Sequence, residues 1–280
     1  MPAVIYTNQA SLMAQKGLLG AQNSLALSVE RLSSGLRINR AKDDAAGLGV
    51  GENLQKQLNG VKQGINNLND AISMAQTAEG ALSKVGDSLQ RMRELAVQAR
   101  NASNSDADKD SLDKEFKQLQ AEITRVFGGT SFNGKHMLGA DATAMTFQIG
   151  ANTTADDVLT VSTSNMTTDS NITAVTSSAT IDATATDGAI KNVIDNIDKA
   201  IDAVNDQRAT FGATQSRFDA IISSLQSGVE NQSAARGRIM DADFAQETAN
   251  MSRAQILQQA GTAMVAQANQ MPQQVLSLLR

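Results

Sequence analysis

Hydrophobic residues recur at alternating steps of three and four along most of this chain, the period of a helix that packs along one face. The most regular stretch runs from Leu54 to Ala75, and after one irregular step the same pattern resumes. Asp43 or Asp44 is placed to cap this helix at its N-terminus. From Asp44 to Arg100 the helix would span about 85 Å. Because no globular core is that long, the pattern predicts long coiled-coil helices.

A second helix is expected after the turn-like string NASNSDAD, where Ser105 or Asp106 can serve as the cap. Its apolar stripe runs from Leu112 to Val126, and Gly128-Gly129 ends it. The short connection and the stripe together predict that this helix folds back antiparallel on the long one.

Residues 130–185 have a different character, because helical stripes stop and Thr, Ser, Asn and Gly become frequent. Apolar residues alternate with polar ones over 145–149 and 159–161, on either side of the turn-rich string GANTTADD. This pattern predicts a β-hairpin followed by a Ser/Thr-rich excursion on the surface.

Helix is predicted again after Thr186 or Asp187, and it continues until a break at SAARGRIMDAD. A last helix follows that break. Asp243 and Gln246 stand at its start with the spacing of a capping box.

The two ends of the chain are almost free of charge. Residues 1–29 carry only Lys16, and residues 254–279 carry no charge at all. A solitary amphipathic helix in water normally has a charged face, so we expect both ends to be buried against each other and against further copies of the chain. The alternative is that they only pack within one monomer. The residues expected to pack are Leu18, Leu25, Val29, Leu32, Leu36, Ile256, Leu257, Met264, Met271, Val275 and Leu278.

Composition narrows the possible functions. The chain has 24 basic and 29 acidic residues, a net charge of −5, and no basic block that would favour nucleic acid. It has no cysteine and one histidine, His136, so no catalytic, metal-binding or cofactor-binding residues are predicted. No apolar run approaches the ~20 residues of a membrane helix, and the N-terminus lacks the basic region of a classical secretory signal. We therefore expect a soluble chain, or one exported by another route.

Several strings, taken together and in order, resemble bacterial flagellin. They are ERLSSGLRINRAKDDAAGLGV (30–50), LQRMRELAVQARN (89–101), FNGKHML (132–138), RIMDADFAQETANMSRAQILQQAG (238–261) and ANQMPQQVLSLLR (268–280). The likeness covers roughly residues 1–150 and 185–280. Their joint occurrence is specific to that family, whereas a heptad stretch alone is not.

The resemblance implies a mainly α fold, with long coiled-coil helices in a core and a rod domain and a small β-hairpin region. The core domain would take residues 1–43, which include a linker, and residues 237–280. The rod would take residues 44–185, with the hairpin and variable excursion, and the returning helix 186–236. Large outer domains would be absent from so short a chain.

The resemblance also implies a non-enzymatic structural subunit that is exported and self-assembles into the extracellular helical filament of the flagellum for swimming. Its implied partners are further copies of the chain, an export chaperone at residues 245–280, the type III export apparatus, and the filament cap and hook-junction proteins. It implies no cofactor and no insertion into a membrane.

One further site is implied by the string QRMRELAVQ, which matches the rod motif of flagellins that the host Toll-like receptor 5 recognises. Carried over by position, the receptor contacts would be Arg91, Leu95 and Gln98 on one helix and Glu115 on its antiparallel neighbour. Steps of four and seven place the first three on one helix face. The arginine would hydrogen-bond across the interface, and an exposed leucine would fill a receptor pocket.

Two alternatives remain at the level of the sequence. A hook–filament junction protein shares the helical termini, although the strings LSSGLRIN and SRAQILQQAG fit flagellin better. A chemoreceptor-like signalling hairpin is also rich in heptads, but it would require one continuous hairpin with strongly charged flanks. The hairpin region at 130–185 and the uncharged ends argue against that reading.

Overall fold

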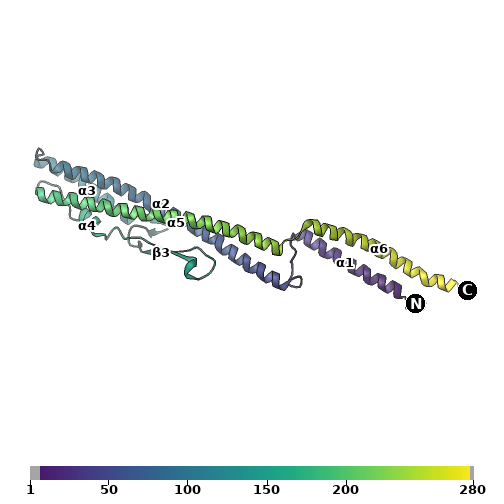
Figure 1. The fold of residues 1–280 in the computed structure, drawn as a ribbon. Helices are drawn as coiled ribbons and strands as arrows, with labels where there is room; N and C mark the ends of the chain where they lie inside the picture. The colour runs from purple at the N-terminus through teal and green to yellow at the C-terminus, as the bar shows by residue number, and fades with distance from the viewer. Residues whose placement is uncertain (1–6, 278–280) are drawn as a thin grey trace. The chain divides into compact units, whose positions relative to one another are not determined.

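The computed structural model describes the backbone of residues 7–277 and the side chains of residues 7–271. The fold is mainly helical (Figure 1). The six α-helices of the described chain are α1 (Gln9–Ser34), α2 (Ala45–Ala99), α3 (Asp106–Gly129), α4 (Ser170–Thr176), α5 (Asp187–Met240) and α6 (Phe244–Ser277). The strands are β1 (Ser131–Phe132), β2 (Lys135–His136), β3 (Ala144–Gln148) and β4 (Val158–Ser162), with one 3-10 turn, η1 (Ala155–Asp157).

The chain forms two compact units. One, here called the central unit, consists of residues 57–229. The other, the terminal unit, combines residues 1–56 with residues 230–280. Both boundaries fall inside long helices, one in α2 and the other in α5. The two ends of the sequence therefore fold together, while the middle of the chain has a core of its own.

The central unit packs α2, α3 and α5 side by side around a continuous apolar core (Figure 1). The α2 stripe that the sequence predicted is buried from Ala75 to Ala99 and partly buried before it, and α3 folds back on it as expected. Two arginines also bind carboxylates of α5: Arg93 Nε of α2 lies 2.6 Å from Asp198, and Nε of Arg100, the residue after α2, lies 2.8 Å from Asp187. The largest core side chains include Leu82, Leu89, Phe116, Ile123, Phe127 and Phe211.

The predicted β-hairpin is present as the antiparallel pair β3 and β4, with Phe147 opposite Leu159. Phe147 also meets Phe218 of α5 edge to face, with the ring centroids 5.8 Å apart. The hairpin tip reaches α2 at a glycine, because a Cβ on Gly64 would overlap the carbonyl oxygen of Ile149. Asn67 completes the contact by donating to the Gln148 carbonyl oxygen at 2.8 Å. Gly64 is thus required for the close approach of the hairpin to α2.

The Ser/Thr-rich segment after the hairpin is more than the surface excursion that the sequence predicted. It contains α4, and it buries Ile172, Val175 and Ile181 in the central core. Two buried polar residues of α3 bind its backbone. The Asp113 carboxylate accepts from the Ile181 N–H at 3.0 Å, and the Gln120 amide donates to two carbonyl oxygens, those of Val175 and Ala179. The prediction of a surface segment was wrong because Asp113 and Gln120 are polar residues of α3, and the sequence pattern alone would place them on its solvent face.

Helix caps are present at three starts, and those at Ser105 and Asp44 were predicted. Ser105 forms a capping box at α3, Thr186 accepts from the Ala189 N–H at the start of α5, and Asp44 accepts from the Gly47 N–H at 2.8 Å. Asp43 instead accepts from the N–H groups of the preceding turn, at Asn39 and Arg40. Burial raises the pKa of Asp43, but these hydrogen bonds and nearby cations outweigh it and lower the pKa overall.

Two details near the last helix differ from the prediction. The break expected across SAARGRIMDAD is confined to its end, because α5 stays helical through Met240. Asp243 caps α6 by accepting from the N–H groups of Ala245 and Gln246, but the capping box is not reciprocal. The Gln246 side chain donates instead to Asn250, one turn further along the helix.

Candidate assembly surface

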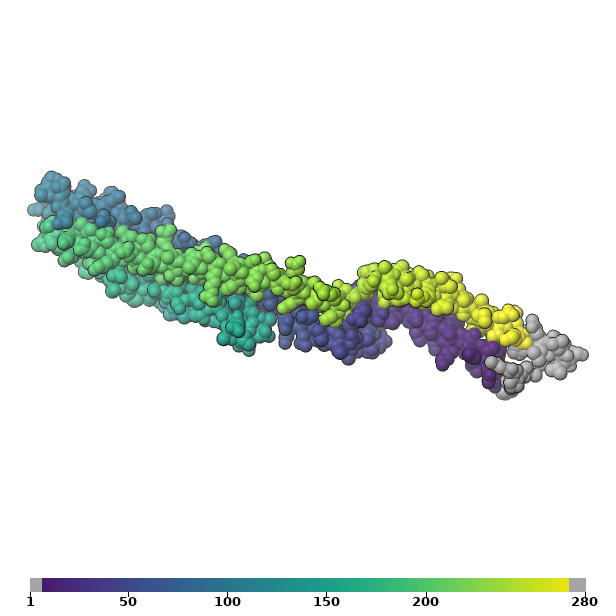
Figure 2. All heavy atoms as spheres, in the orientation of Figure 1, coloured from purple at the N-terminus to yellow at the C-terminus, as the bar shows by residue number. Residues whose placement is uncertain are grey.

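The terminal unit is built on the antiparallel pair α1 and α6, which lie against each other along their length (Figures 1 and 2). Their shared seam buries small side chains: Ser11, Ala21 and Ser28 from α1, and Ala254 and Ala268 from α6. Small residues let two helix backbones come close together. Near one end of the seam, Asn8 donates to the Ala268 carbonyl oxygen at 2.8 Å.

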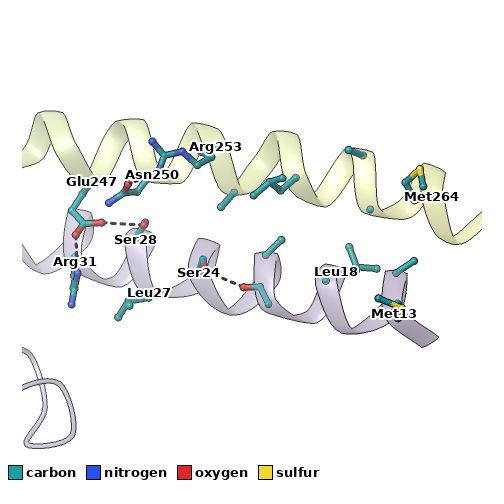
Figure 3. Close-up of a pocket in the computed structure, with 18 of the residues that line it drawn as sticks. Met13, Leu18, Ser24, Leu27, Ser28, Arg31, Glu247, Asn250, Arg253 and Met264 are labelled. Carbon is teal, nitrogen blue, oxygen red and sulfur yellow. Dashed lines mark hydrogen bonds and ion pairs between the residues drawn. The ribbon is translucent and has the colours of Figure 1, made fainter. Parts of the chain in front are cut away.

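The other end of this seam holds a buried ion pair. The Glu247 carboxylate, with 9% of its side chain exposed, accepts from Ser28 Oγ at 3.0 Å and from an Arg31 guanidinium nitrogen at 2.8 Å (Figure 3). Burial raises the pKa of Glu247, but hydrogen bonds from Arg31, Ser28 and Asn250 outweigh burial and lower the pKa overall. The carboxylate therefore stays charged and ties α6 to α1.

A groove of about 940 Å³ runs beside this seam, between α1 and α6 (Figure 3). Its walls are two further rows of residues, each spaced by three and four along its helix. The α1 row is Ala10, Met13, Gly17, Gly20, Ser24, Leu27 and Arg31, and the α6 row is Asn250, Arg253, Leu257, Ala260 and Met264. This is the spacing of a coiled-coil seam. Apart from Arg31 and Asn250, the residues of both rows are exposed, so each helix carries a second seam that its own chain leaves largely uncovered among the described residues.

The apolar residues exposed on the described chain are concentrated in the terminal unit. Eleven of the twelve large exposed hydrophobic side chains belong to it, and the exception is Val97. By contrast, Ile38 and Met240 are its only large apolar side chains in the buried class among the described residues. An exposed apolar surface of this kind marks an interaction site.

The packing residues predicted from the sequence divide between the seam and this exposed surface. Leu18, Leu25, Leu32 and Leu36 are half-buried, while Val29, Ile256, Leu257, Met264 and Met271 are exposed. The Val275 side chain and Leu278 lie outside the described residues. Sequence reasoning therefore missed the small residues that close the seam, since it looked for large apolar side chains.

The residues expected to contact a host receptor do not form one exposed face. Arg91 is exposed and donates to Glu115 at 2.8 Å and to Glu94 at 3.0 Å, and Gln98 is also exposed. These hydrogen bonds raise the pKa of Arg91. Leu95 is fully buried in the central core, so the expectation of an exposed leucine that fills a receptor pocket is wrong.

Within the described chain, no three His, Cys, Asp or Glu side chains come together in a way that could hold a metal ion. None of the helices over residues 7–277 is both long and apolar enough to cross a membrane. The geometry does provide the helix pair α1 and α6, which share a closely packed seam and expose apolar side chains on their remaining surface. That arrangement defines a structural subunit that assembles by helix packing.

Comparison with known proteins identifies the family. Residues 5–143 match the model of the bacterial flagellin N-terminal helical region, and residues 194–279 match that of the C-terminal helical region. A flagellin of Xenorhabdus nematophila is 42% identical over the whole of both chains, and one of Halalkalibacterium halodurans is 41% identical over 99% of this chain and 100% of its own. The chain belongs to the bacterial flagellin family.

Membership of this family gives the function. The protein is a subunit of the extracellular flagellar filament, serves motility, and is structural rather than enzymatic. A putative flagellar hook-associated protein of Vibrio parahaemolyticus has a similar fold, with a TM-score of 0.58 over 71% of this chain and 100% of that one. At 14% identity this likeness concerns the fold alone.

Proposed function

We propose that the groove between α1 and α6 receives a helix of a neighbouring copy when the filament grows. The observation that carries this proposal is the second seam, with its matched rows spaced by three and four on both walls. A neighbouring copy suits the groove because Gly17, Gly20 and Ala260 leave room for close approach and because most of its length is uncharged. The charged groups are confined to one end, at Arg31, Glu247 and Arg253.

A single cysteine in the groove tests this contact directly, because the chain has no cysteine of its own. A Cβ on Gly20 meets nothing within 4 Å, so Gly20→Cys fits the isolated chain without strain. We expect a maleimide to label this thiol readily in the monomer and at least about tenfold more slowly in filaments, since a covering helix excludes the reagent. Equal labelling rates in the two states would contradict the proposal.

Under this proposal the filament core lies within the terminal unit. The core domain takes residues 1–43 and 237–280, and the rod takes 44–185 and 186–236. In support, the two ends of the sequence share one compact unit and carry the exposed apolar side chains.

The same apolar surface gives a reason for further partners. Before assembly, Ile256, Leu257, Met264 and Met271 of α6 would be exposed to water, which favours aggregation. We propose that an export chaperone covers residues 245–280 until the type III export apparatus takes up the chain. At the two ends of the growing filament, the cap and hook-junction proteins would offer helices of the same kind.

We also propose that Toll-like receptor 5 of the host contacts the monomer at Arg91, Gln98 and Glu115. The support is the exposed ion pair that joins Arg91 of α2 to Glu115 of α3, with 49% and 47% of the two side chains exposed. A guanidinium held in place by two carboxylates still has free N–H donors for a partner. Leu95 would support this face from the core rather than touch the receptor.

Replacing Arg91 and Glu115 together by alanine is expected to lower receptor signalling by at least about tenfold, because an interface arginine often dominates binding. Both side chains are half-exposed, so the thermal unfolding of the monomer should barely change. Arg93→Ala is the matched control, since Arg93 is equally exposed and pairs with Asp198 of α5. Full signalling by the double variant, or an equal loss in the control, would refute the assignment.

A further inference from the structure

The methionines of the described chain divide sharply by exposure. Met92, Met137 and Met166 of the central unit are at most 2% exposed. Met13, Met264 and Met271 are 75%, 61% and 49% exposed, and they are the only methionines of residues 7–271 in the exposed class. All three lie on α1 or α6 of the terminal unit.

Two of these exposed methionines face the same groove from opposite walls, Met13 from α1 and Met264 from α6 (Figure 3). Met271 follows Met264 by seven residues, so it continues the same helix face. The thioethers therefore stand where, on the proposed function, a neighbouring copy packs. Methionine is suited to such a surface because it is flexible and apolar.

We propose that Met13, Met264 and Met271 form an oxidation-sensitive site whose conversion to sulfoxide by hydrogen peroxide blocks assembly, and which the finished filament protects. This inference rests on the proposed role of the groove. The thioether sulfur attacks one peroxide oxygen, a sulfur–oxygen bond forms and the oxygen–oxygen bond breaks. The departing hydroxide takes up the remaining proton as water, so the sulfur is oxidised by two electrons and the peroxide is reduced.

The consequence for packing follows from the product. A sulfoxide is polar and chiral, and it disrupts interfaces that depend on apolar methionine. In the monomer the sulfoxide should barely change the free energy of unfolding, because these three side chains are already in water. In the filament the sulfoxide oxygen would be buried against apolar residues such as Ala10 and Ala260, whose side chains offer it no hydrogen-bond donor. Oxidation should therefore spare the fold of the subunit and oppose its addition to the filament.

The experiment treats purified full-length monomer and, separately, filaments with hydrogen peroxide, and measures each methionine by mass spectrometry after digestion. In the monomer we expect Met13, Met264 and Met271 to oxidise at least about tenfold faster than Met92, Met137 and Met166, which serve as internal controls. In filaments we expect the oxidation rate of Met13, Met264 and Met271 to fall by about tenfold or more. Seeded growth should then require at least about tenfold more oxidised than untreated monomer.

A variant with M13L, M264L and M271L keeps the apolar surface but cannot be oxidised there. It should polymerise after peroxide treatment as it does before, and methionine sulfoxide reductase should restore growth to the oxidised natural chain. Normal growth of fully oxidised monomer would overturn the inference, and so would failure of the reductase to restore growth. If untreated monomer failed to extend seeds, the proposed function itself would fail, which is a distinguishable result.

Discussion

Replacing Leu257 and Met264 together by glutamate is expected to abolish filament growth and to leave the monomer folded. Both side chains are more than half exposed in the single chain, at 53% and 61%, so a carboxylate at either position remains in water there. Both also line the groove between α1 and α6. In the filament the two charges would be buried against an apolar helix without partners, which is strongly unfavourable.

The expected effect is an increase of at least about a hundredfold in the monomer concentration needed to extend seeds, which corresponds to about 2.8 kcal/mol. Sedimentation after seeding measures it, and thermal unfolding of the monomer shows that the fold is intact. The matched control exchanges apolar for apolar, Leu257→Met with Met264→Leu, and should grow normally. Normal growth of the glutamate variant would mean that this groove is not part of the assembly contact.

Arg31→Ala is expected to loosen α1 from α6, because it leaves the buried Glu247 carboxylate without its cation. Removing one partner of a buried ion pair costs about 3 kcal/mol. Hydrogen exchange of the α1 backbone amides measures this loss within the intact chain. Adding Glu247→Gln to Arg31→Ala should recover part of the protection, since the uncompensated charge is then removed. Arg253→Ala is the control, because Arg253 is exposed and its only side-chain hydrogen bond among the described residues is to Asn250.

The pH dependence of this contact is expected to be weaker in Arg31→Ala than in the natural chain. In the natural chain the pKa of Glu247 is below its ordinary value, so the stabilisation is complete above that value and is lost as the pH falls through the lowered pKa. In Arg31→Ala burial still raises the pKa of Glu247 and the hydrogen bonds from Ser28 and Asn250 still lower it, so acidification should weaken α1–α6 pairing less than it does in the natural chain. An equally large loss of protection with acid in both chains would contradict the assigned role of Arg31.

The long helices could be predicted from the sequence because their burial follows one spacing for many turns. Leu68, Leu82 and Leu89 of α2 are fully buried, as the pattern requires. The exposure of a single residue beside this apolar stripe of α2 could not be predicted in the same way. Leu95 is buried because α2 packs against both α3 and α5, so its buried face is wider than one heptad stripe.

The burial of the Ser/Thr-rich segment after the hairpin could not be predicted, because it depends on contacts with residues that are distant in the sequence. Val175 and Ile181 are isolated apolar residues in a Ser/Thr-rich segment, and no periodicity marks them. What holds them in place is the pair of polar side chains Asp113 and Gln120, which bind backbone groups of that segment. A polar residue in a helical pattern is normally assigned to the solvent face.

The assembly surface was predictable in kind but not in detail. The lack of charge at both ends indicated packing against further copies, and large apolar residues were expected to form the contact. In the structure the seam within the chain is closed by small residues such as Ala254 and Ala268, while Leu257 and Met264 point outward. Which apolar row turns inward depends on how closely two helix backbones approach, and that is a property of the pair rather than of either helix.

The central claim is that the groove between α1 and α6 is an interface between copies. Electron cryomicroscopy of filaments grown on seeds from the full-length chain tests it most directly. The account predicts a helix of a neighbouring copy lying along the groove from Met13 to Arg31, with Leu257 and Met264 buried beneath it. A filament in which this groove is open to solvent, with neighbouring copies packed on other faces of α1 and α6, would contradict it.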